Sequence, residues 1–441
     1  MRVLIVSYYF PPAAGGGVQR VLSWCRYLPE YGWDVHVLAP DDPRWIDSGG
    51  GLEVPSDTIV HRSENPSPAS LRPREYVAAA RGPLHRMWRR LVLLPRRIRI
   101  PDMHIGWARP SVRAGMRVVR EHDIDLIISS SPPETTHVIA SRIARRTGIP
   151  WIADYRDSWL DLPHLRLDRP TVRFKHALNR LLARRVMRGA KAVTTVSDPL
   201  AHDLRRRHPK LRVEVVTNGV DTAQLMNLPH PSSLLDGTTR DDRFVVSYTG
   251  NFFGRQSPQS FLAAVTRLME RRPDIPGLMR IRFVGGIKAE DHAVIDASQQ
   301  LSSMVERIPF MDYRDVLAEQ AAADLLLLYV APGHGSAGVF TGKVFEYVAS
   351  ARPVLALVPE GNVCIDLLTQ AGTGRVVDPD DVESIAATLE AEFDQWRANG
   401  RTEYTVPEAV LQSISREHLA GRVAQLAAEL QGSAPEVRTL A

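Results

Sequence analysis

The sequence predicts an α/β fold made of two Rossmann-like domains, each with a doubly wound parallel sheet. Three observations support this prediction. The chain has 441 residues, more than a typical single domain. Short, continuous apolar runs alternate with amphipathic segments, as expected for buried parallel strands joined by helices. The alternation gives way to a polar, loop-rich stretch near the middle of the chain and then restarts, which indicates two domains.

The first half contains the first set of predicted strands and helices. Residues 2–7 form a continuous apolar run, and residues 18–31 carry apolar side chains near helical spacing. Further strands are expected at residues 34–38, 126–129, 151–153, 192–196 and 212–216, and helices at 133–147, 170–188 and 198–207.

The second half repeats this pattern after a polar, loop-rich stretch at residues 222–242, which we interpret as a linker. Its strands are expected at residues 244–248, 281–284, 325–329, 353–357 and 375–377, and its helices at 257–271, 313–323, 341–351, 362–371 and 380–397. The predicted domains are residues 1–221 and 243–414, followed by a helix at 415–430 and a disordered tail at 433–441.

Composition narrows the class of protein. With 44% hydrophobic and 24% charged residues, the chain is typical of globular proteins. Cys25 and Cys364 are far apart, so neither a disulfide framework nor a cysteine zinc site is implied. The apolar run at the N-terminus is too short for a signal peptide, and no stretch approaches the roughly 20 apolar residues of a membrane span. A cytoplasmic location is expected.

Basic residues are clustered, and the net charge is +5. Residues 81–100 contain seven arginines and no acidic residue. This segment suits either an amphipathic helix on the inner face of an anionic membrane or an insertion packed over the first domain. A second cluster lies at residues 173–191, where a solvated helix face is the simpler interpretation. No nucleic-acid partner is expected.

Ligands of open α/β sheets bind beyond the carboxyl ends of the strands, so the loops after strands are the candidate sites. The first contains Gly16 and Gly17, which allow close approach of a ligand to the backbone. It lacks the spacing of a dinucleotide fingerprint, which disfavours a nicotinamide or flavin enzyme. Two further loops in the first half bring His137 and the pair Arg156 and Asp157 after buried strands, where they could converge on one cleft and contact a ligand.

Two loops in the second half have features of a phosphate site. Gly250 and Arg255 follow the strand at 244–248, and an arginine there can bind phosphate oxygens in a bidentate manner. The other loop runs through Gly338, Val339 and Phe340 to a helix that starts near Thr341. Helix N-termini favour anions. Lys343 adds a positive charge in the first turn, and Glu346 is placed to accept hydrogen bonds from ribose hydroxyls.

The sequence resembles the GT-B glycosyltransferases, specifically the retaining family-4 type, over nearly its whole length. The segments that carry the resemblance are residues 15–17, 154–159, 196–200, 218–221, 248–250, 283–285, 342–349 and 352–355. Among them are Asp154-Tyr155-Arg156-Asp157 and Gly342-Lys343-Val344-Phe345-Glu346.

The resemblance implies that a sugar is transferred from a nucleotide-diphosphate sugar with retention of configuration and without a required cofactor or metal. Arg255 and Lys343 would hold the diphosphate and Glu346 the ribose, while backbone near Phe310 and Met311 would meet the base. The Gly16 loop and His137 would face the transferred sugar and the acceptor, and the final helix would pack on the first domain.

Two positions depart from the family pattern. The family often has a glutamate eight positions before Glu346 that contacts sugar hydroxyls, and Gly338 stands there in this chain. The lysine that usually follows the phosphate arginine is also missing, and Ser260 stands near its place. Donor-sugar contacts could instead come from backbone amides of the same loop.

Two alternatives remain open from the sequence. One is a hydrolysing nucleotide-sugar epimerase of the same fold, which would need acid and base groups such as His137 and Asp157. The other is a non-catalytic nucleotide-binding scaffold, since function resides in sites and not in folds. The acceptor could be a sugar, a lipid-linked glycan or a small molecule.

Overall fold

The computed structural model describes residues 1–13, 16–41, 52–66, 82–83, 99–160, 169–222, 242–252, 254–333 and 335–432. They form two compact units. Unit 1 comprises Met1–Thr217 with Leu419–Ala441, and unit 2 comprises Asn218–His418. Almost all of the expected linker, most of residues 81–100 and the tail at 433–441 lie outside the described residues.

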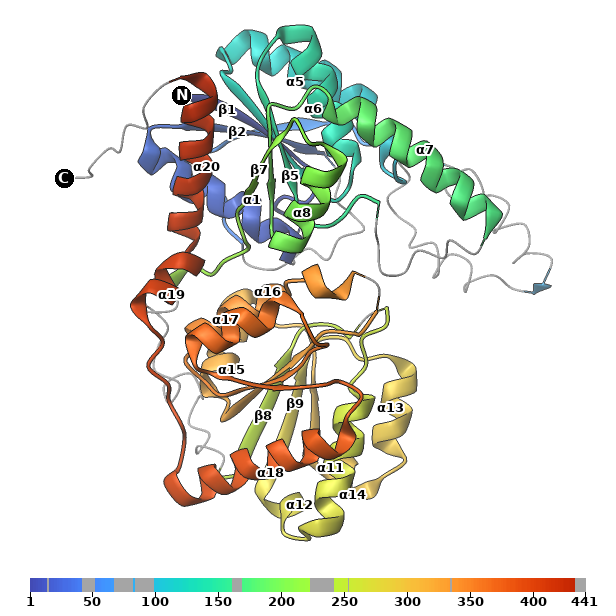
Figure 1. The fold of residues 1–441 in the computed structure, drawn as a ribbon, viewed down its shortest axis with the longest axis vertical. Helices are drawn as coiled ribbons and strands as arrows, with labels where there is room; N and C mark the ends of the chain where they lie inside the picture. Colours follow the sequence, from blue (N-terminus) through green and yellow to red (C-terminus); the bar gives the residue numbers. More distant parts are fainter. Residues whose placement is uncertain are drawn as a thin grey trace. The chain divides into compact units, whose positions relative to one another are not determined.

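Unit 1 is built on a parallel sheet of seven described strands in the order β3-β2-β1-β4-β5-β6-β7 (Figure 1). The strands are β1 (Arg2–Ser7), β2 (Asp34–Pro40), β3 (Ile59–Ser63), β4 (Leu126–Ser131), β5 (Trp151–Tyr155), β6 (Ala192–Thr195) and β7 (Arg212–Val215). The main helices are α1 (Gly16–Tyr27), α5 (Ala108–His122), α6 (Thr135–Thr147), α7 (Pro170–Met187), α8 (Asp198–Arg207) and α20 (Arg416–Gln431).

Unit 2 repeats this plan with six described strands in the order β10-β9-β8-β11-β12-β13 (Figure 1). The strands are β8 (Phe244–Thr249), β9 (Met279–Val284), β10 (Val305–Ile308), β11 (Leu325–Tyr329), β12 (Val354–Leu357) and β13 (Gly374–Val377). The helices are α11 (Gln259–Arg271), α12 (Ile275–Leu278), α13 (Ala289–Asp296), α14 (Gln299–Met304), α15 (Tyr313–Ala322), α16 (Gly342–Ala349), α17 (Val363–Ala371), α18 (Val382–Asn399) and α19 (Glu408–Ile414).

The central strands are buried along nearly their whole length because helices cover both faces of each sheet. In β11 all five residues are buried, and in β1 only Arg2 is exposed. One face of the unit 1 sheet packs on α20, whose Leu419, Val423 and Ala427 share a hydrophobic cluster with residues of α1 and β1. The C-terminal helix therefore completes the core of unit 1, although it follows the whole of unit 2 in sequence.

The predicted fold class is confirmed: both units are doubly wound parallel sheets. Two strands, β3 and β10, and the helices α5, α12, α13, α14 and α19 were not predicted from the sequence. Both strands lie at a sheet edge, and each has a single buried residue. Such strands lack the continuous apolar run by which the others were predicted.

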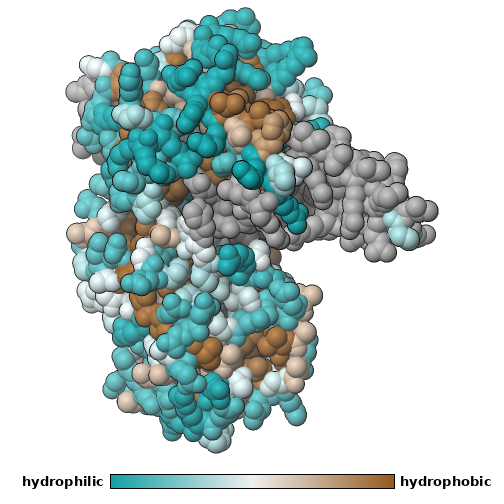
Figure 2. Space-filling view, turned by 45° about the vertical axis from the view of Figure 1, so that its right-hand side comes forward, coloured by the Kyte–Doolittle hydropathy of each residue, from teal (hydrophilic) through white to brown (hydrophobic). Residues whose placement is uncertain are grey.

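No described helix is both long and apolar enough to cross a membrane. Figure 2 shows hydrophilic residues over most of the visible face, with smaller hydrophobic areas between them. A hydrophobic residue on the surface is common in proteins and needs no special explanation when it stands alone.

Candidate functional site

Each sheet has one point at which the strand order reverses direction. In unit 1 it lies between β1 and β4, and in unit 2 between β8 and β11. At such a switch point the two following helices leave on opposite faces of the sheet, which opens a crevice for a ligand at the carboxyl edge. The loops chosen from the sequence are those that follow these four strands and the loop that follows β5.

In unit 2, Lys343 lies in the first turn of α16, where free backbone N–H groups and the helix dipole attract anions. Its Nζ sits 3.8 Å from the centre of the Tyr248 ring at the end of β8. Among the described residues, Nζ is paired with no carboxylate. Burial lowers the pKa of Lys343 from 10.5 to about 7, although the charge of nearby Glu346 acts in the opposite direction. A partly buried ammonium without an anionic partner is suited to an anionic ligand.

Lys343 can lie against the Tyr248 ring because Gly250 has no side chain. A Cβ atom at Gly250 would be 2.5 Å from Cε and 2.8 Å from Nζ of Lys343, and the residue has φ +124°. The loop after β9 is equally tight, since a Cβ at Gly285 would be 2.6 Å from the carbonyl oxygen of Gly250. The backbone N–H of Gly286 donates to Oδ1 of Asn251 at 2.6 Å. Together these contacts fix the loop that follows β8 against the loop that follows β9.

Arg255 lies against the loop after β11. A Cβ at Gly333 would be 2.7 Å from Nη1 of Arg255, and Gly333 has φ +149°. Arg255 is exposed, and no described residue accepts a hydrogen bond from it. The structure therefore places Gly250 next to Lys343 and Arg255 next to Gly333, on the two loops that flank the switch point.

Glu346 lies one turn after Lys343 on α16. Its Oε2 accepts a hydrogen bond from Nε2 of Gln320 at 2.9 Å, and Gln320 also donates to Oγ1 of Thr249 at 2.9 Å. Gln320 is fully buried on α15. The glutamate is thus held in a fixed orientation and keeps further acceptor capacity for a ligand hydroxyl.

The loop before α16 is anchored by a residue that the sequence analysis did not select. Nδ2 of Asn362 donates to the carbonyl oxygens of Ser336, at 2.5 Å, and Val339, at 3.3 Å. Its Oδ1 accepts from the backbone N–H of Cys364 at 2.9 Å and so caps α17. Asn362 is a buried polar residue at the start of a helix. An asparagine at such a position is a common N-cap, and this is the signal in the sequence by which it could have been found.

The remaining predicted residues of unit 2 lie around this loop and at the end of β10. Gly338 is buried in a single 3-10 turn, Val339 and Phe340 are partly buried, and Thr341 is the N-cap residue of α16. Phe310 and Met311 follow β10 at the same carboxyl edge. Phe310 is 60% exposed, an unusual position for a large aromatic side chain.

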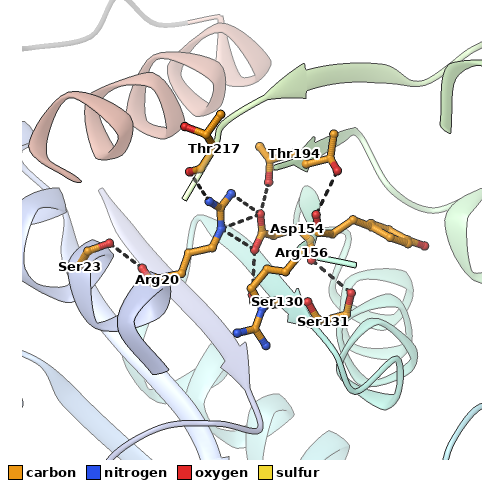
Figure 3. A network of polar contacts seen from close by, with 10 residues as sticks. Arg20, Ser23, Ser130, Ser131, Asp154, Arg156, Thr194 and Thr217 are labelled. Atoms are coloured by element: carbon orange, nitrogen blue, oxygen red, sulfur yellow. Dashed lines mark hydrogen bonds and ion pairs between the residues drawn. The ribbon is translucent and has the colours of Figure 1, made fainter. Parts of the chain in front are cut away.

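In unit 1, a buried ion pair lies below the carboxyl edge (Figure 3). Asp154 on β5 is fully buried and accepts from Arg20 of α1 at 2.7 and 3.0 Å. It also accepts from Ser130 of β4 at 2.8 Å and from Thr194 of β6 at 2.7 Å. Burial alone would raise the pKa of Asp154, but the Arg20 charge and these hydrogen bonds lower it. The network joins three neighbouring strands to α1.

Arg156 uses its guanidinium to bind backbone carbonyls. It donates to Ser131 at 2.9 Å, to Pro132 at 2.8 Å and to Gly17. The structure thus brings Gly17 and Arg156 together and joins the start of α1 to the loop after β4. Gly16 and Asp157 are exposed, and a Cβ at Gly16 would meet nothing within 4 Å.

His137 is not at the surface of this loop. Its ring is fully buried and stacks on Tyr155 with centroids 4.6 Å apart, and its Nδ1 lies 2.7 Å from Oγ of Ser129. Burial lowers the pKa of His137 to about 3, so the ring is neutral at pH 7. The side chain points from α6 into the core because this face of the helix packs on β4 and β5. In this structure the ring offers no surface to a ligand.

Two carboxylic acids stand closer to the carboxyl edge than His137 does. Asp102 accepts from the backbone N–H and the hydroxyl of Thr135, both at 2.8 Å. Burial and the charge of Asp102 raise the pKa of Glu134, the residue before α6, to about 8. Neither residue was selected from the sequence, because Asp102 lies far from Glu134 along the chain and only the fold brings them together.

Comparison with protein families gives a match for each half of the chain. Residues 15–219 match the family described as Glycosyl transferase 4-like domain, and residues 243–393 match Glycosyl transferases group 1. With the two doubly wound sheets, these matches show that the chain belongs to the GT-B glycosyltransferases of the family-4 type. It is therefore a glycosyltransferase.

Solved structures share the fold over nearly the whole chain. Sucrose-phosphate synthase from Thermosynechococcus elongatus is 17% identical with a TM-score of 0.66, covering 98% of this chain and 99% of that one. HepE of Anabaena, solved with UDP and glucose, is 15% identical with a TM-score of 0.61, covering 96% and 98%. An α,α-trehalose-phosphate synthase (UDP-forming) from Burkholderia xenovorans, solved with glucose-6-phosphate, is 13% identical with a TM-score of 0.64, covering 98% and 100%. A comparison with curated protein sequences gives no match.

Proposed function

We propose that this glycosyltransferase uses a nucleotide-diphosphate sugar as donor and binds it at the carboxyl edge of unit 2. The observation that supports this proposal most strongly is the position of Lys343. Its partly buried ammonium lies in the first turn of α16 and has no carboxylate partner among the described residues. Arg255, which is exposed beside Gly333, supplies a second positive charge on the facing loop. Two cations and a helix N-terminus match the charge of a diphosphate.

The other contacts of the donor follow from the same edge of the sheet. Glu346, oriented by Gln320, accepts hydrogen bonds from the ribose hydroxyls. The exposed Phe310 and the neighbouring Met311 lie where the base would be placed. Since Gly338 has no side chain, the transferred sugar is bound by backbone groups of the loop at residues 336–341.

We further propose transfer with retention of configuration and without a metal in the reaction. Arg255, Lys343 and the α16 dipole stabilise the negative charge that develops on the leaving diphosphate. The acceptor hydroxyl attacks the anomeric carbon from the face that the diphosphate leaves, the bond from that carbon to the diphosphate oxygen breaks, and the hydroxyl proton passes to the leaving diphosphate. Unit 1 binds this acceptor, with Gly16, Gly17 and Asp157 as the candidate contacts. Arg156 orients the backbone at Gly17 by donating hydrogen bonds to the carbonyl oxygens of Gly17 and Pro132.

The structures solved with ligands are consistent with this proposal. HepE was solved with UDP and glucose, and the trehalose-phosphate synthase with glucose-6-phosphate. For this chain, the base, the sugar and the acceptor class are to be determined by experiment. A thermal-shift screen with UDP, GDP, ADP and dTDP identifies the base, because a ligand that binds only the native state raises its stability.

The phosphate assignment is tested by substituting its two cations. Arg255→Ala and Lys343→Ala should each remove about 2–4 kcal/mol of transition-state stabilisation, measured as kcat/KM of sugar transfer. Arg267→Ala is the control, since this residue lies on α11 and pairs with Glu270 of the same helix. Near-normal rates in both site variants would show that the diphosphate is bound elsewhere.

Product analysis separates the proposed reaction from its alternatives. Transfer with retention gives a glycoside with the anomeric configuration of the donor. A hydrolysing epimerase would instead release free nucleotide and an epimer, and a scaffold would bind nucleotide without turnover. Transfer that persists in excess EDTA supports a mechanism without metal in the reaction.

Peripheral contact with an anionic membrane is a separate proposal. It concerns residues 81–100, of which the structure describes only positions 82, 83, 99 and 100. Flotation with anionic liposomes at low salt tests this proposal. If the protein does not float with the liposomes, membrane contact is removed from the proposed function.

A further inference from the structure

Three histidines of unit 1 meet away from the proposed substrate sites. His36 is on β2, His61 is on β3, and His122 is the last residue of α5. Their ligand atoms all lie within 4.8 Å of one another. His36 is buried, and the other two are partly buried. None of them has a role in the proposed sugar transfer.

The contact between two of the rings shows that at least one of the facing nitrogens carries a lone pair, and a metal bound there would replace the shared proton. Nδ1 of His36 lies 3.0 Å from Nε2 of His61. A contact of this length needs one protonated and one unprotonated nitrogen, so the two rings cannot both be cations. The His122 ring lies 4.7 Å from that of His36 and 5.3 Å from that of His61, centre to centre. Neutral imidazole is the common protein ligand of first-row transition metals.

We propose that His36, His61 and His122 bind a divalent transition metal such as Zn²⁺, with solvent as the fourth ligand. Zn–N bonds of about 2.0–2.1 Å place two nitrogens of a tetrahedral site about 3.3 Å apart. The nitrogens of His36 and His61 are already 3.0 Å apart. His122 completes the set by a small side-chain movement, because it is partly exposed at the end of its helix.

The charges around the cluster permit a cation. Asp34 and Glu121 lie close enough to act on the histidines electrostatically. Arg2 opposes a cation, but its charge is offset by Asp34 at 3.7 Å and Asp123 at 3.2 Å. A site that takes one ligand from each of β2, β3 and α5 would hold the edge strand β3 and α5 in place.

The position in the fold indicates a structural role for the metal. α5 ends at His122, just before β4 begins at Leu126, so the cluster lies toward the amino edge of the sheet. The loops proposed to bind substrate lie at the carboxyl edge. The metal is therefore expected to raise the stability of unit 1 without taking part in transfer.

The test uses full-length protein without a histidine tag, first stripped with EDTA. Zn²⁺ binding is measured by calorimetry, and Co²⁺ binding by the visible absorption that marks a tetrahedral site. We compare the wild type with His61→Ala, His122→Ala and the control His202→Ala, an exposed histidine of α8. Thermal unfolding of each protein is recorded with and without Zn²⁺, because a bound metal stabilises the native state.

We expect a single saturable site in the wild type and in His202→Ala, with a rise in Tm on adding Zn²⁺. His61→Ala and His122→Ala should bind at least about tenfold more weakly and lose that rise. Because His122 is partly exposed, its variant should still fold, which unchanged nucleotide binding would verify. The proposal is overturned if the wild type shows no saturable binding or if the cluster variants bind like the control.

Discussion

At the scale of single residues, the proposed diphosphate site depends on the charge of Lys343. Its ammonium is partly desolvated, and its pKa is lowered to about 7, so near neutral pH a fraction of the unliganded protein carries a neutral lysine. A bound diphosphate restores the charged form, because an opposite charge favours ionisation. The proposed function therefore predicts that diphosphate binding is coupled to uptake of a proton.

This coupling predicts a pH dependence of nucleotide binding. Affinity should be greatest below pH 7 and should fall as the pH rises through about 7, as Lys343 loses its proton. Calorimetry in buffers of different ionisation enthalpy should show net proton uptake near pH 7–8. Lys343→Arg should remove the uptake while retaining a positive charge. Equal uptake in that variant would assign the proton to another group.

Glu134 provides a prediction about stability at the same scale. Its pKa is raised from 4.5 to about 8, so it is protonated in the folded state where the unfolded chain would ionise. Its stabilisation is complete below pH 4.5 and is lost as the pH rises toward about 8. Glu134→Gln should therefore weaken the decline of Tm across this range. A parallel decline in wild type and variant would contradict the assignment.

Arg20 and Asp154 show how a buried pair affects the same unit. Arg20→Met leaves Asp154 buried without its cation and should lower the free energy of unfolding by about 3–5 kcal/mol. Adding Asp154→Leu removes the uncompensated charge and should recover part of that loss. Chemical denaturation of the two variants measures the difference. If the double variant is no more stable than Arg20→Met, hydrogen bonds and not charge dominate the network.

At the scale of elements, α17 orients the loop that precedes α16. Asn362 joins them, because its amide nitrogen bonds the loop while its oxygen caps the helix. The two roles use different atoms and can be separated by substitution. Asn362→Asp retains the cap and removes the donors to Ser336 and Val339, whereas Asn362→Ala removes both.

We therefore expect Asn362→Asp to weaken donor binding, seen as a raised KM, and to lose stability as its buried carboxyl group ionises against the carbonyl oxygens of Ser336 and Val339. Asn362→Ala should raise KM and also lose about 1 kcal/mol from the missing cap. Steady-state kinetics and Tm together distinguish the cases. Equal KM values in the wild type and both variants would show that the loop does not need this anchor.

At the scale of the whole molecule, the last helix belongs to the first unit. Val423 of α20 is 1% exposed within the cluster formed with α1 and β1. Val423→Ala should destabilise unit 1 by about 1.5 kcal/mol or more, from the lost burial of two carbon atoms plus a cavity. Glu417→Ala, on the exposed side of the same helix, is the control. Hydrogen exchange should show the loss of protection in unit 1 and not in unit 2.

Much of the architecture was predictable from the sequence by itself. Buried strands such as β1 and β11 are continuous apolar runs, and helices such as α8 have clear starts, so local patterns were enough to predict both sheets. The loops after those strands follow from the topology, and so did the choice of Arg255 and Lys343. Edge strands β3 and β10 were missed because pairing with a single neighbour permits a mixed pattern.

Only the tertiary structure decided which way side chains point and which distant residues meet. His137 follows a buried strand, as Lys343 does, yet its ring turns into the core while the lysine stays beside the loops. The meeting of His36, His61 and His122 likewise depends on how α5 packs beside β2 and β3. The physical reason is that periodicity along the chain reports which face of an element is buried. Contacts between segments far apart in sequence are set by the packing of one element on another.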